Sequence, residues 1–468
     1  MPDLSEEAKE AQKSYRWTNK LNTTAYELPE SQKKKNRTAV ANLFAGEWIK
    51  IIKEGDVETE VKFRGGTGYV PTESIGSERT LEIYFIDVGQ GDSILIQTPD
   101  DKRILIDGGK NKSAFSFLKW KYHLGPEEQN AYTKDFDAII MTHGDSDHLA
   151  GLLPVLESEY VTVKRIYHNG LATRDKKPTY GKTEKLNKDT LLVELYDEIE
   201  DLTPIKDNLT PTFKKWVEAV SKAKERAINS NQDFKCIRAD QNTEPLVIGG
   251  EKPLKITFLN PINFGTKDAP KLMDFGDDGE TINGNSVGVL LEYGKAKILL
   301  CGDMNEKANA VFLQNTDVAM PIAQVFKASH HGSQYFTSDF LKAVQPWMSV
   351  VSAGDNTYGH PTAVLLGSLG HYAPNVVEKP LVFATQLAAT FKRVTVSSKK
   401  QGPQLYEKVT FGLVNVRTDG EWLAVGRVYK SQKRTKNGKP AKSLWDWEKY
   451  AFNLKNAKML TNNLLESE

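Results

Sequence analysis

The chain has 468 residues, enough for two or three domains or for one large domain with additions. Its 62 lysines and arginines balance 61 aspartates and glutamates, so the formal net charge of +1 creates no global field that attracts nucleic acid. Two cysteines, Cys236 and Cys301, cannot form a disulfide framework, no apolar run is long enough to span a membrane, and the polar N-terminus lacks the apolar core of a signal peptide. We therefore expect a globular, cytoplasmic protein without membrane contact, and any binding of a polyanion must use a local patch.

The N-terminal 76 residues divide into a polar lead and a β module. Residues 1–40 are charged with weak periodicity, which predicts a flexible or helical lead. In residues 41–76, glycine-rich turns separate runs in which apolar positions alternate with polar ones, at Ile49, Ile51, Val61 and Phe63. The ending Gly68-Tyr69-Val70 resembles a bacterial SH3-type domain. This resemblance implies binding of a peptide or polymer, hence a protein partner, and the alternative is a structural cap on the main domain.

The main domain, residues 81–400, begins with short apolar runs joined by tight turns, which predict a meandering sheet. Asp107 ends the third run and precedes Gly108-Gly109, two residues that adopt positive φ readily. Strands and helices then alternate. The predicted strands are Ile83 to Val88, Ser93 to Gln97, Arg103 to Ile106, Ala138 to Met141, Leu254 to Leu259, Ser286 to Glu292, Lys297 to Cys301, Ile322 to Lys327 and Met348 to Ser352. The predicted helices are Leu149 to Leu156, Glu306 to Leu313 and Ser338 to Val344.

Residues 168–245 differ from their surroundings because they are charged and rich in lysine. Patterns at Leu191 to Tyr196 and Trp216 to Val220 predict helices, and we interpret the segment as a mostly helical insertion over the active face. Strands and helices on both sides of this insertion predict an α/β fold, an αββα sandwich.

The C-terminal segment, residues 401–468, contains three predicted parts. Strands are expected at Lys408 to Arg417 and at Trp422 to Val428. A basic stretch follows from Lys430 to Lys442, and it is either a set of phosphate contacts or a solvated linker. Leu444 to Leu465 is expected to be a helix.

The segment Thr142 to His148 carries the strongest chemical signal. His143, Asp145, Asp147 and His148 are four potential metal ligands directly after an apolar strand. Imidazoles and carboxylates this close repel one another or stay solvated unless a cation joins them, and borderline divalent metals accept this mixed nitrogen and oxygen set.

Further candidate ligands also follow predicted strands. They are Asp303, the pair His330-His331, and His360. Two adjacent buried histidines are rare in a core because each needs a partner. Such a set supplies enough ligands for two divalent ions, which at a separation of about 3.5–4 Å lower the pKa of a shared water and produce a hydroxide near neutral pH. His168 follows a strand but lacks this context, as do His123 and His371.

These residues, in this order, resemble the metallo-β-lactamase superfamily, and within it the ComEC-like hydrolase domain of bacterial competence proteins. The resemblance covers about residues 81–375 apart from the insertion. It rests on Phe85 to Ser93, Leu105 to Gly109, His143 to His148, Asn285-Ser286, Gly302-Asp303, His330 to Ser333 and Gly359 to Pro361. Competence proteins carry this domain beside a membrane channel, whereas this chain has no predicted membrane segment.

The resemblance implies roles for individual residues. His143 and Asp145 would hold one metal, Asp147 and His148 the other, and Asp303 would bridge them. His360 and one of the two histidines His330 and His331 would complete the shells; we assign His330 as the ligand and His331, with Asp147, to catalysis. Asn285 and Ser333 would bind substrate. Asp145 replaces the histidine of the superfamily pattern, and this harder oxygen ligand favours Mn²⁺ or Mg²⁺, with Zn²⁺ as the alternative.

Three functions follow from this reading. The first is a metal-dependent phosphodiesterase, a nuclease that acts on DNA or RNA. The second is a phosphodiesterase for a small ester, such as a cyclic nucleotide or a choline-phosphate ester, with the insertion as a lid. The third is an adaptor that binds a partner through its SH3-like module and keeps a structural metal site.

Overall fold

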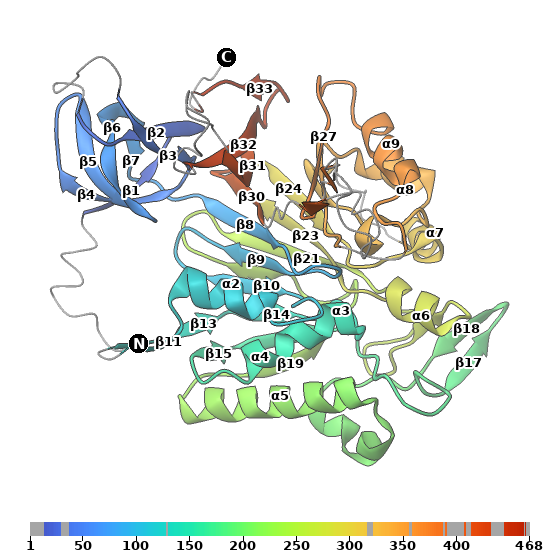
Figure 1. Ribbon diagram of the computed structural model, residues 1–468. Coiled ribbons are helices and arrows are strands. Elements are labelled where there is room, and N and C mark those ends of the chain that lie inside the picture. The colour runs from blue at the N-terminus through green and yellow to red at the C-terminus, as the bar shows by residue number, and fades with distance from the viewer. Residues whose placement is uncertain are drawn as a thin grey trace, which may run out of the picture. The chain divides into compact units, whose positions relative to one another are not determined.

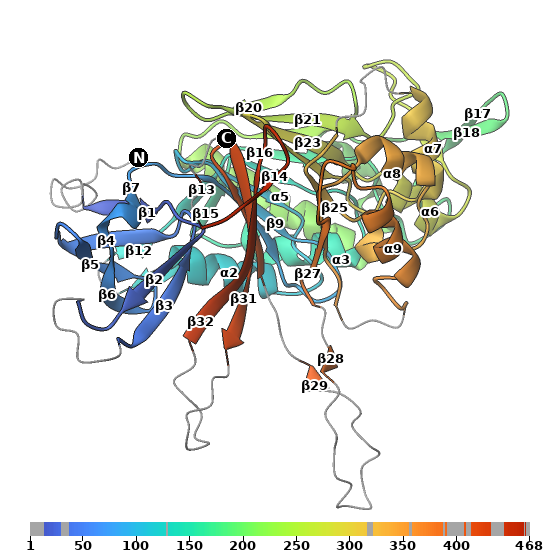
Figure 2. The same cartoon turned by 90° about the horizontal axis from the view of Figure 1, so that it is seen from above.

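The computed structural model describes residues 14–29, 37–127, 130–315, 322–354, 358–386, 389–390, 407–408, 413–431, 444–462 and 464. The chain divides into two compact units. One contains residues 84–293 and 297–413, and the other contains residues up to 83, residues 294–296 and residues from 414 onward. Figures 1 and 2 show the labelled elements of both units from two directions.

The larger unit is built on two sheets. The first has the strand order β19-β16-β14-β10-β9-β8. Its members are β8 (Leu81–Ile86), β9 (Ile94–Gln97), β10 (Arg103–Ile106), β14 (Ala138–Ile140), β16 (Arg165–His168) and β19 (Lys235–Arg238). β9 and β10 form an antiparallel hairpin, whereas β10, β14, β16 and β19 run parallel. Parallel strands end at the same edge, so the loops that follow them lie close together.

The second sheet has the order β20-β21-β23-β24-β25-β26-β27. Its members are β20 (Leu246–Ile248), β21 (Leu254–Asn260), β23 (Gly288–Tyr293), β24 (Ala296–Leu300), β25 (Val325–Lys327), β26 (Met348–Val351) and β27 (Leu381–Ala384). The last four run parallel. The near-continuous apolar sequences of β24, β25 and β26 match their burial on both faces, whereas the edge strand β27 leaves Val382 39% exposed.

Helices cover the outer face of each sheet. One core joins the first sheet to α2 (Ser113–Tyr122), α4 (Leu153–Leu156) and α5 (Pro211–Asn229). Another joins the second sheet to α7 (Glu306–Asn315), α8 (Ser338–Val344) and α9 (Ala363–His371). The short helices α3 (Ser146–Leu149) and η3 (Ala150–Leu152) lie between β14 and α4 along the chain, and α6 (Asp278–Gly284) directly precedes β23. The predicted αββα sandwich is confirmed.

Residues 168–245 contain both helix and strand. α5 is amphipathic, and its apolar side, including Phe213 and Trp216, is buried in the core of the first sheet. The helical prediction at Leu191 to Tyr196 is wrong, because Asp189–Leu192 forms β18 between β17 (Thr183–Leu186) and β22 (Leu272–Asp274). The β17–β18 hairpin projects from the unit in both views. α5 and β19 continue the layers of the sandwich, so the sandwich itself draws on this segment.

The smaller unit contains a seven-stranded antiparallel sheet of order β3-β2-β6-β5-β4-β1-β7. Its strands are β1 (Tyr15–Thr18), β2 (Asn22–Tyr26), β3 (Ala39–Phe44), β4 (Trp48–Lys53), β5 (Glu58–Phe63), β6 (Gly66–Pro71) and β7 (Ile75–Gly76). The predicted alternation is confirmed at Ile49, Val61 and Phe63, which are buried, whereas Ile51 is only half-buried. β1, β2 and the start of β3 lie within residues 15–40, so the flexible or helical lead predicted for residues 1–40 is wrong where the structure describes it. The SH3-like character of the β module stays a prediction.

Where the structure describes it, the C-terminal segment of this unit consists of strands joined by turns. β30 (Leu413–Thr418), β31 (Trp422–Ser431), β32 (Leu444–Asn453) and β33 (Met459–Leu460) follow in order. The helix predicted for Leu444 to Leu465 is wrong where the structure describes it. All ten residues of β32 pair with β31, and Trp447 stacks on Phe44 at 4.9 Å between ring centroids. The aromatic residues that suggested a helix face suit a strand equally well.

Some predictions fall outside the described residues. Of the lead, residues 1–13 and 30–36 are not described, and of the basic stretch from Lys430 to Lys442 only residues 430–431, at the end of β31, are described. The remaining described strands are β11 (Gly125–Glu127), β12 (Asn130–Tyr132), β13 (Lys134–Phe136), β15 (Val161–Val163), β28 (Ala389–Thr390) and β29 (Glu407–Lys408), and the remaining 3-10 helices are η2 (Thr72–Ser74), η4 (Ile199–Asn208) and η5 (His330–Gly332).

Candidate metal centre

The predicted ligands follow the ends of strands in both sheets. In the first sheet, β14 ends at Ile140, His143 and Asp145 lie in the loop that follows, and Asp147 and His148 lie in α3. In the second, Asp303 follows β24, His330 and His331 follow β25, and His360 follows β26. The structure brings these segments together in the larger unit.

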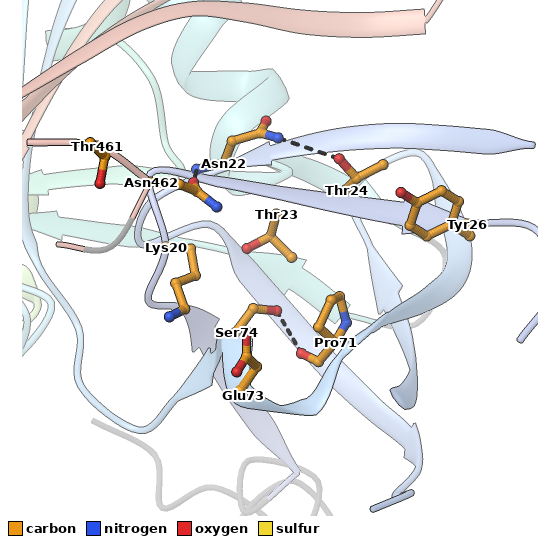
Figure 3. A pocket seen from close by; sticks show the side chains of 10 residues that line it. All are labelled: Lys20, Asn22, Thr23, Thr24, Tyr26, Pro71, Glu73, Ser74, Thr461 and Asn462. Carbon is orange, nitrogen blue, oxygen red and sulfur yellow. Dashed lines mark hydrogen bonds between the residues drawn. The ribbon is translucent and has the colours of Figure 1, made fainter. Parts of the chain in front are cut away.

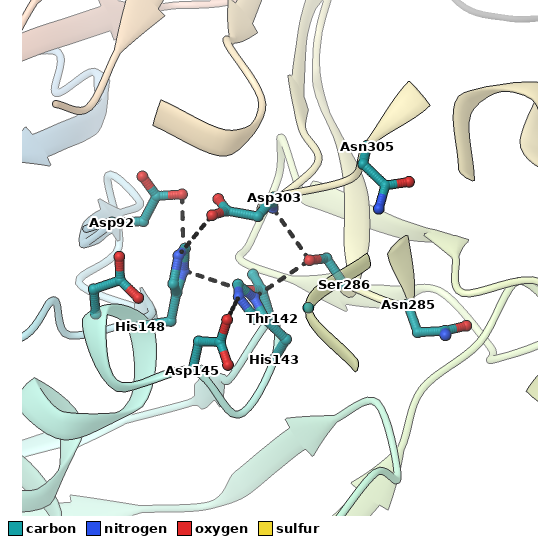
Figure 4. Close-up of polar contacts among 12 residues, drawn as sticks. Asp92, Thr142, His143, Asp145, His148, Asn285, Ser286, Asp303 and Asn305 are labelled. Atoms are coloured by element: carbon teal, nitrogen blue, oxygen red, sulfur yellow. Dashed lines mark hydrogen bonds and ion pairs between the residues drawn. The ribbon is translucent and has the colours of Figure 1, made fainter. Parts of the chain in front are cut away.

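Four buried side chains form what we call the inner group: Asp92, His148, Asp303 and His331. Each offers a ligand atom, and these atoms lie within 4.8 Å of one another. Asp303 Oδ2 lies 3.0 Å from His331 Nε2 and 3.3 Å from His148 Nε2, and these two nitrogens are 3.3 Å apart. Figure 4 shows Asp92, His148 and Asp303 turned toward one another.

Asp147 lies at the edge of the inner group. Its Oδ2 is 3.4 Å from His331 Nε2, and its side chain keeps 25% of its exposure. The Gly-Gln-Gly-Asp turn approaches from the other side, where the Asp92 amide donates to the Asp147 carbonyl at 3.3 Å. Gly91 has a φ of +126° there, and a Cβ would lie 2.2 Å from that carbonyl oxygen, so only glycine permits this approach.

The remaining predicted ligands, Asp145, His330 and His360, form a more open outer group. Asp145 Oδ2 lies 3.7 Å from His143 Nε2, and its side chain is 42% exposed. The rings of His330 and His360 are 5.7 Å apart, and those of His330 and His331 are 6.1 Å apart. His330 and His331 both have positive φ, at 50° and 53°, a backbone strain that is typical of functional sites in non-glycine residues.

Hydrogen bonds at Nδ1 fix the orientation of three histidines. His148 Nδ1 lies 2.8 Å from Asp107 Oδ2, and His331 Nδ1 lies 3.0 Å from the Ser352 carbonyl oxygen. His143 Nδ1 lies 3.0 Å from Thr142 Oγ1 and 3.3 Å from Ser286 Oγ. A proton on Nδ1 leaves each Nε2 with a free lone pair, which is how metal-binding imidazoles are usually prepared.

The donor set fits divalent metal ions. Within the described part of the chain, His143 Nε2, His330 Nδ1 and Asp303 Oδ1 are buried atoms without a hydrogen-bond partner. Buried polar atoms are seldom left in this state, because the loss of water is then not compensated. Imidazole nitrogens with carboxylate oxygens suit Zn²⁺ and Mn²⁺, and the carboxylates of Asp145, Asp147 and Asp303 also suit Mg²⁺.

The electrostatics of the two groups differ. Burial disfavours the charged forms of His148 and His331, but Asp303 and the other nearby carboxylates outweigh it and raise both pKa values well above the usual range. Burial likewise opposes ionisation of Asp147 and Asp303, yet the adjacent histidines lower the pKa of both. For His330 and His360, burial dominates and lowers the pKa. The inner group therefore attracts positive charge strongly, as a metal site must.

Two residues that sequence reasoning did not assign to the site belong to it. Asp107 accepts hydrogen bonds from the Thr142 amide at 2.8 Å and the Thr142 hydroxyl at 2.6 Å, besides its contact with His148. Asp92 lies in the inner group. Both stand in motifs that carried the family resemblance, Leu105 to Gly109 and Phe85 to Ser93, so the signal was present but without an assigned role.

Lys327, the last residue of β25, is the third unexpected member. Its side chain is 1% exposed, and its Nζ donates to the Gly302 carbonyl at 2.9 Å. It also pairs with Asp92 Oδ2 and lies 3.5 Å from Asp303 Oδ1. Burial opposes the charge on Lys327, but Asp92 and Asp303 together raise its pKa.

The predicted substrate-binding residues have local partners. Both donor contacts of the Asn285 amide go to carbonyl oxygens, of Met273 and Thr281, each at 2.8 Å. Ser286 stands closer to the chemistry, since its Oγ accepts from the Asp303 amide at 3.1 Å (Figure 4). Ser333 Oγ accepts from the Tyr335 amide at 3.2 Å. Asn305, also drawn in Figure 4, donates to the Glu280 carbonyl at 2.8 Å.

His168 is separate from the centre, as expected from its sequence context. Its Nδ1 accepts from the Gly170 amide at 3.0 Å, its Nε2 lies 3.1 Å from the Asp197 carbonyl, and its ring stacks on Tyr196 at 4.2 Å. Burial lowers its pKa to about 3.

The smaller unit contains a cavity of about 440 Å³, and none of the residues of the centre lines it. Figure 3 shows its polar lining. The lining residues are Lys20, Asn22, Thr23, Thr24, Tyr26, Pro71, Glu73, Ser74, Thr461 and Asn462.

Comparisons with known proteins agree with this site. The family model described as the metallo-beta-lactamase superfamily matches residues 86–215, which contain His143 to His148. ComE operon protein 3 of Bacillus subtilis (strain 168) is 25% identical over 309 residues, which are 63% of this chain and 31% of that protein. The chain therefore spans about a third of the length of this relative. Both matches confirm the resemblance drawn from the motifs. None of the helices in the described ranges is long and apolar enough to cross a membrane.

Proposed function

Because residues 86–215 match the family model of the metallo-beta-lactamase superfamily, we propose that this chain is a metal-dependent phosphodiesterase that cleaves nucleic acid. One observation carries the proposal: Asp303 Oδ2 contacts the Nε2 atoms of both His148 and His331, which are 3.3 Å apart, and Asp147 Oδ2 lies 3.4 Å from the Nε2 atom of His331. A structural metal site in an adaptor would need only one closed set of ligands, whereas here an open group lies next to the closed one.

The geometry supports a revised assignment of the ligands. Asp147, His148 and His331 would hold one ion, and His143 and Asp145 would hold the other, with Asp303 between them. This assigns to metal binding His331, which the sequence suggested for catalysis. His330 and His360 are then left at the outer side, where their lowered pKa values keep each ring neutral, able to donate from one nitrogen and to accept at the other.

Bound divalent ions would supply an activated water and would neutralise charge on the phosphate. The protein orients that chemistry. Asp107 and the Ser352 carbonyl hold the imidazoles of His148 and His331, and Ser286 holds the Asp303 backbone. His330 and His360 can hydrogen-bond the phosphate oxygens or the leaving oxygen, and a group in this place contributes about 10²–10⁴-fold to a rate when it also transfers a proton.

Two observations favour a nucleic acid over a small ester. The motifs resemble the ComEC-like branch, in which phosphodiester chemistry is expected. In addition, Tyr335 and Tyr358, next to the ligand loops, are 59% and 74% exposed. Exposed aromatic rings beside a phosphodiesterase centre can stack on nucleobases.

The test is hydrolysis with Mn²⁺, Zn²⁺ or Mg²⁺ of single-stranded DNA, duplex DNA, RNA and bis-p-nitrophenyl phosphate. Asp147→Ala should lose about 10³-fold or more, as expected when a metal ligand is removed. Asp339→Ala is the matched control, because Asp339 on α8 is exposed and its carboxylate pairs with Lys342 on the same helix. Equal activity of Asp147→Ala and the wild type would contradict the proposal. Cleavage of the small ester without cleavage of any polynucleotide would move it to the small-ester class.

A further inference from the structure

Lys327 is a buried cation inside a centre that also attracts metal cations. Its Nζ is enclosed by the Gly302 carbonyl, Asp92 and Asp303. A lysine this deeply buried loses its hydration, so its position must be maintained by its three partners. Its ammonium group therefore acts on two carboxylates at once, those of Asp92 and Asp303.

Among the ring nitrogens of the two histidines, Asp92 is closest to the Nδ1 atoms. Its Oδ1 lies 3.5 Å from His331 Nδ1, and its Oδ2 lies 4.0 Å from His148 Nδ1. By contrast, Asp303 lies against the Nε2 atoms of both rings. Proximity alone places Asp92 in the inner group, but an imidazole cannot present Nδ1 and Nε2 to the same ion. Asp92 is nearest the Nδ1 atoms and Asp303 is nearest the Nε2 atoms, which are the atoms free to bind metal. This difference separates Asp92 from the metal ligands.

Charge balance gives the same result. Five carboxylates surround the centre, from Asp92, Asp107, Asp145, Asp147 and Asp303. Two divalent ions supply four positive charges, and the ammonium of Lys327 supplies the fifth. Without Lys327, the uncompensated carboxylate would be Asp92, which is 2% exposed and therefore poorly screened by water.

We propose that Lys327 is a positioning residue whose ammonium keeps Asp92 as an ion-pair partner outside the metal shell and holds Asp303 so that its Oδ2 faces the metals. This inference rests on the metal centre of the proposed function and not on its substrate. Failure of the chain to cleave nucleic acid would leave it standing, because the measurement that decides it is the dissociation constant for Mn²⁺, which needs no substrate.

Lys327→Met is the first variant. Removal of the ammonium leaves the negative charge of Asp92 beside the metals, so the dissociation constant for Mn²⁺, measured by chelator competition, should fall about tenfold or more. The kcat should fall at the same time, because Asp303 loses its contact at Oδ1, while KM stays within a factor of about two. Tighter metal binding with slower turnover distinguishes this role from a merely structural one, in which both would weaken. Weaker Mn²⁺ binding by Lys327→Met would overturn the proposal.

The double variant Asp92→Asn with Lys327→Met removes both charges together and avoids an unpaired buried carboxylate. If Asp92 is only a partner of Lys327, its dissociation constant for Mn²⁺ should return to within about threefold of the wild type. If Asp92 is a metal ligand, the double variant should bind about 10–100-fold more weakly, which refutes the assignment. This variant decides the matter even if Lys327→Met cannot be purified. Lys297→Met is the control, because it removes an exposed lysine whose Nζ lies 3.6 Å from Glu292. It should change neither the dissociation constant for Mn²⁺ nor the kcat.

Discussion

The inner and outer groups of the centre contain the same kinds of side chain in different surroundings. Asp92, His148, Asp303 and His331 are buried and touch one another, whereas Asp145 is 42% exposed and His330 and His360 lie in looser contact. The pKa values of His148 and His331 are raised, and those of His330 and His360 are lowered. The closed side is therefore suited to holding cations, and the open side to meeting a substrate.

Burial does not explain this difference. His168 is as deeply buried as His148, yet its pKa falls to about 3. Its ring nitrogens meet a backbone amide and a backbone carbonyl, whereas His148 meets Asp107 and Asp303. Carboxylates, and not depth, make the inner histidines attract charge.

The largest expected effect comes from breaking the support of the inner group. Asp107→Asn should weaken Mn²⁺ binding about 10–100-fold, because loss of the carboxylate that fixes a metal-binding imidazole usually has this effect. The measurement is chelator competition on the folded protein. Asp137→Asn is the matched control: Asp137 is also buried, but it pairs with Lys164 and the Arg103 amide. An equal loss in both variants would show general destabilisation instead of a specific role.

The parts of the site that the sequence predicted are those encoded locally. His143 to His148 follow one strand, and Asp303, His330, His331 and His360 each follow another, so the rule that strand ends meet at a sheet edge placed them together. Lys327 could not be placed in this way, because a lysine at the end of a strand is usually solvated. Only the convergence of β8–β9, β24 and β25 shows that its partners are Asp92 and Asp303.

The fold shows the same limit. The layers of the sandwich were predictable because their strands are continuous apolar runs. β32 was mistaken for a helix because Trp445 and Trp447 fit either structure, and its pairing with β31 lies outside any local window. Our proposal that His331 and not His330 is a metal ligand likewise rests on the contact of His331 Nδ1 with the carbonyl of Ser352, a residue directly after β26.

An effect of intermediate size is expected on the pH dependence of stability, through His168. This residue tests whether burial of a histidine away from carboxylates disfavours its charged form. Its folded pKa of about 3 lies below the unfolded value of about 6.5, so the unfolded chain binds more protons between these values. The contribution of neutral His168 to the free energy of unfolding is thus fully present above pH 6.5 and is lost as the pH falls toward 3. Between pH 7 and pH 5 the free energy of unfolding should fall by about 2 kcal/mol on this account.

The measurement for His168 is denaturant unfolding at several pH values in the presence of a chelator. His168→Asn should be less stable at pH 7 but should lose less of its stability between pH 7 and pH 5 than the wild type. A wild-type and variant difference that stays constant over this range would mean that His168 does not titrate as the structure indicates. His371→Asn, at the exposed end of α9, is the control and should leave the pH profile unchanged.

The smallest effect should come from the open side, where Tyr335 and Tyr358 extend the outer group. The ring of Tyr358 lies over that of His360 at 5.8 Å and an interplanar angle of 28°, with 74% of the residue exposed. One stacked base contributes about 1–3 kcal/mol, so the double variant Tyr335→Ala with Tyr358→Ala should raise KM for single-stranded DNA by about fivefold or more and leave Mn²⁺ affinity unchanged.

An abasic oligonucleotide of the same length is the matched substrate and should show no such change, because it has the phosphates without the bases. Trp120→Ala is the matched variant, since Trp120 is 55% exposed on α2, which carries no residue of the centre. Equal losses on both substrates would show that the tyrosines shape the loops instead of stacking on bases, and the division between a side that holds metal and a side that reads substrate would then lose its support.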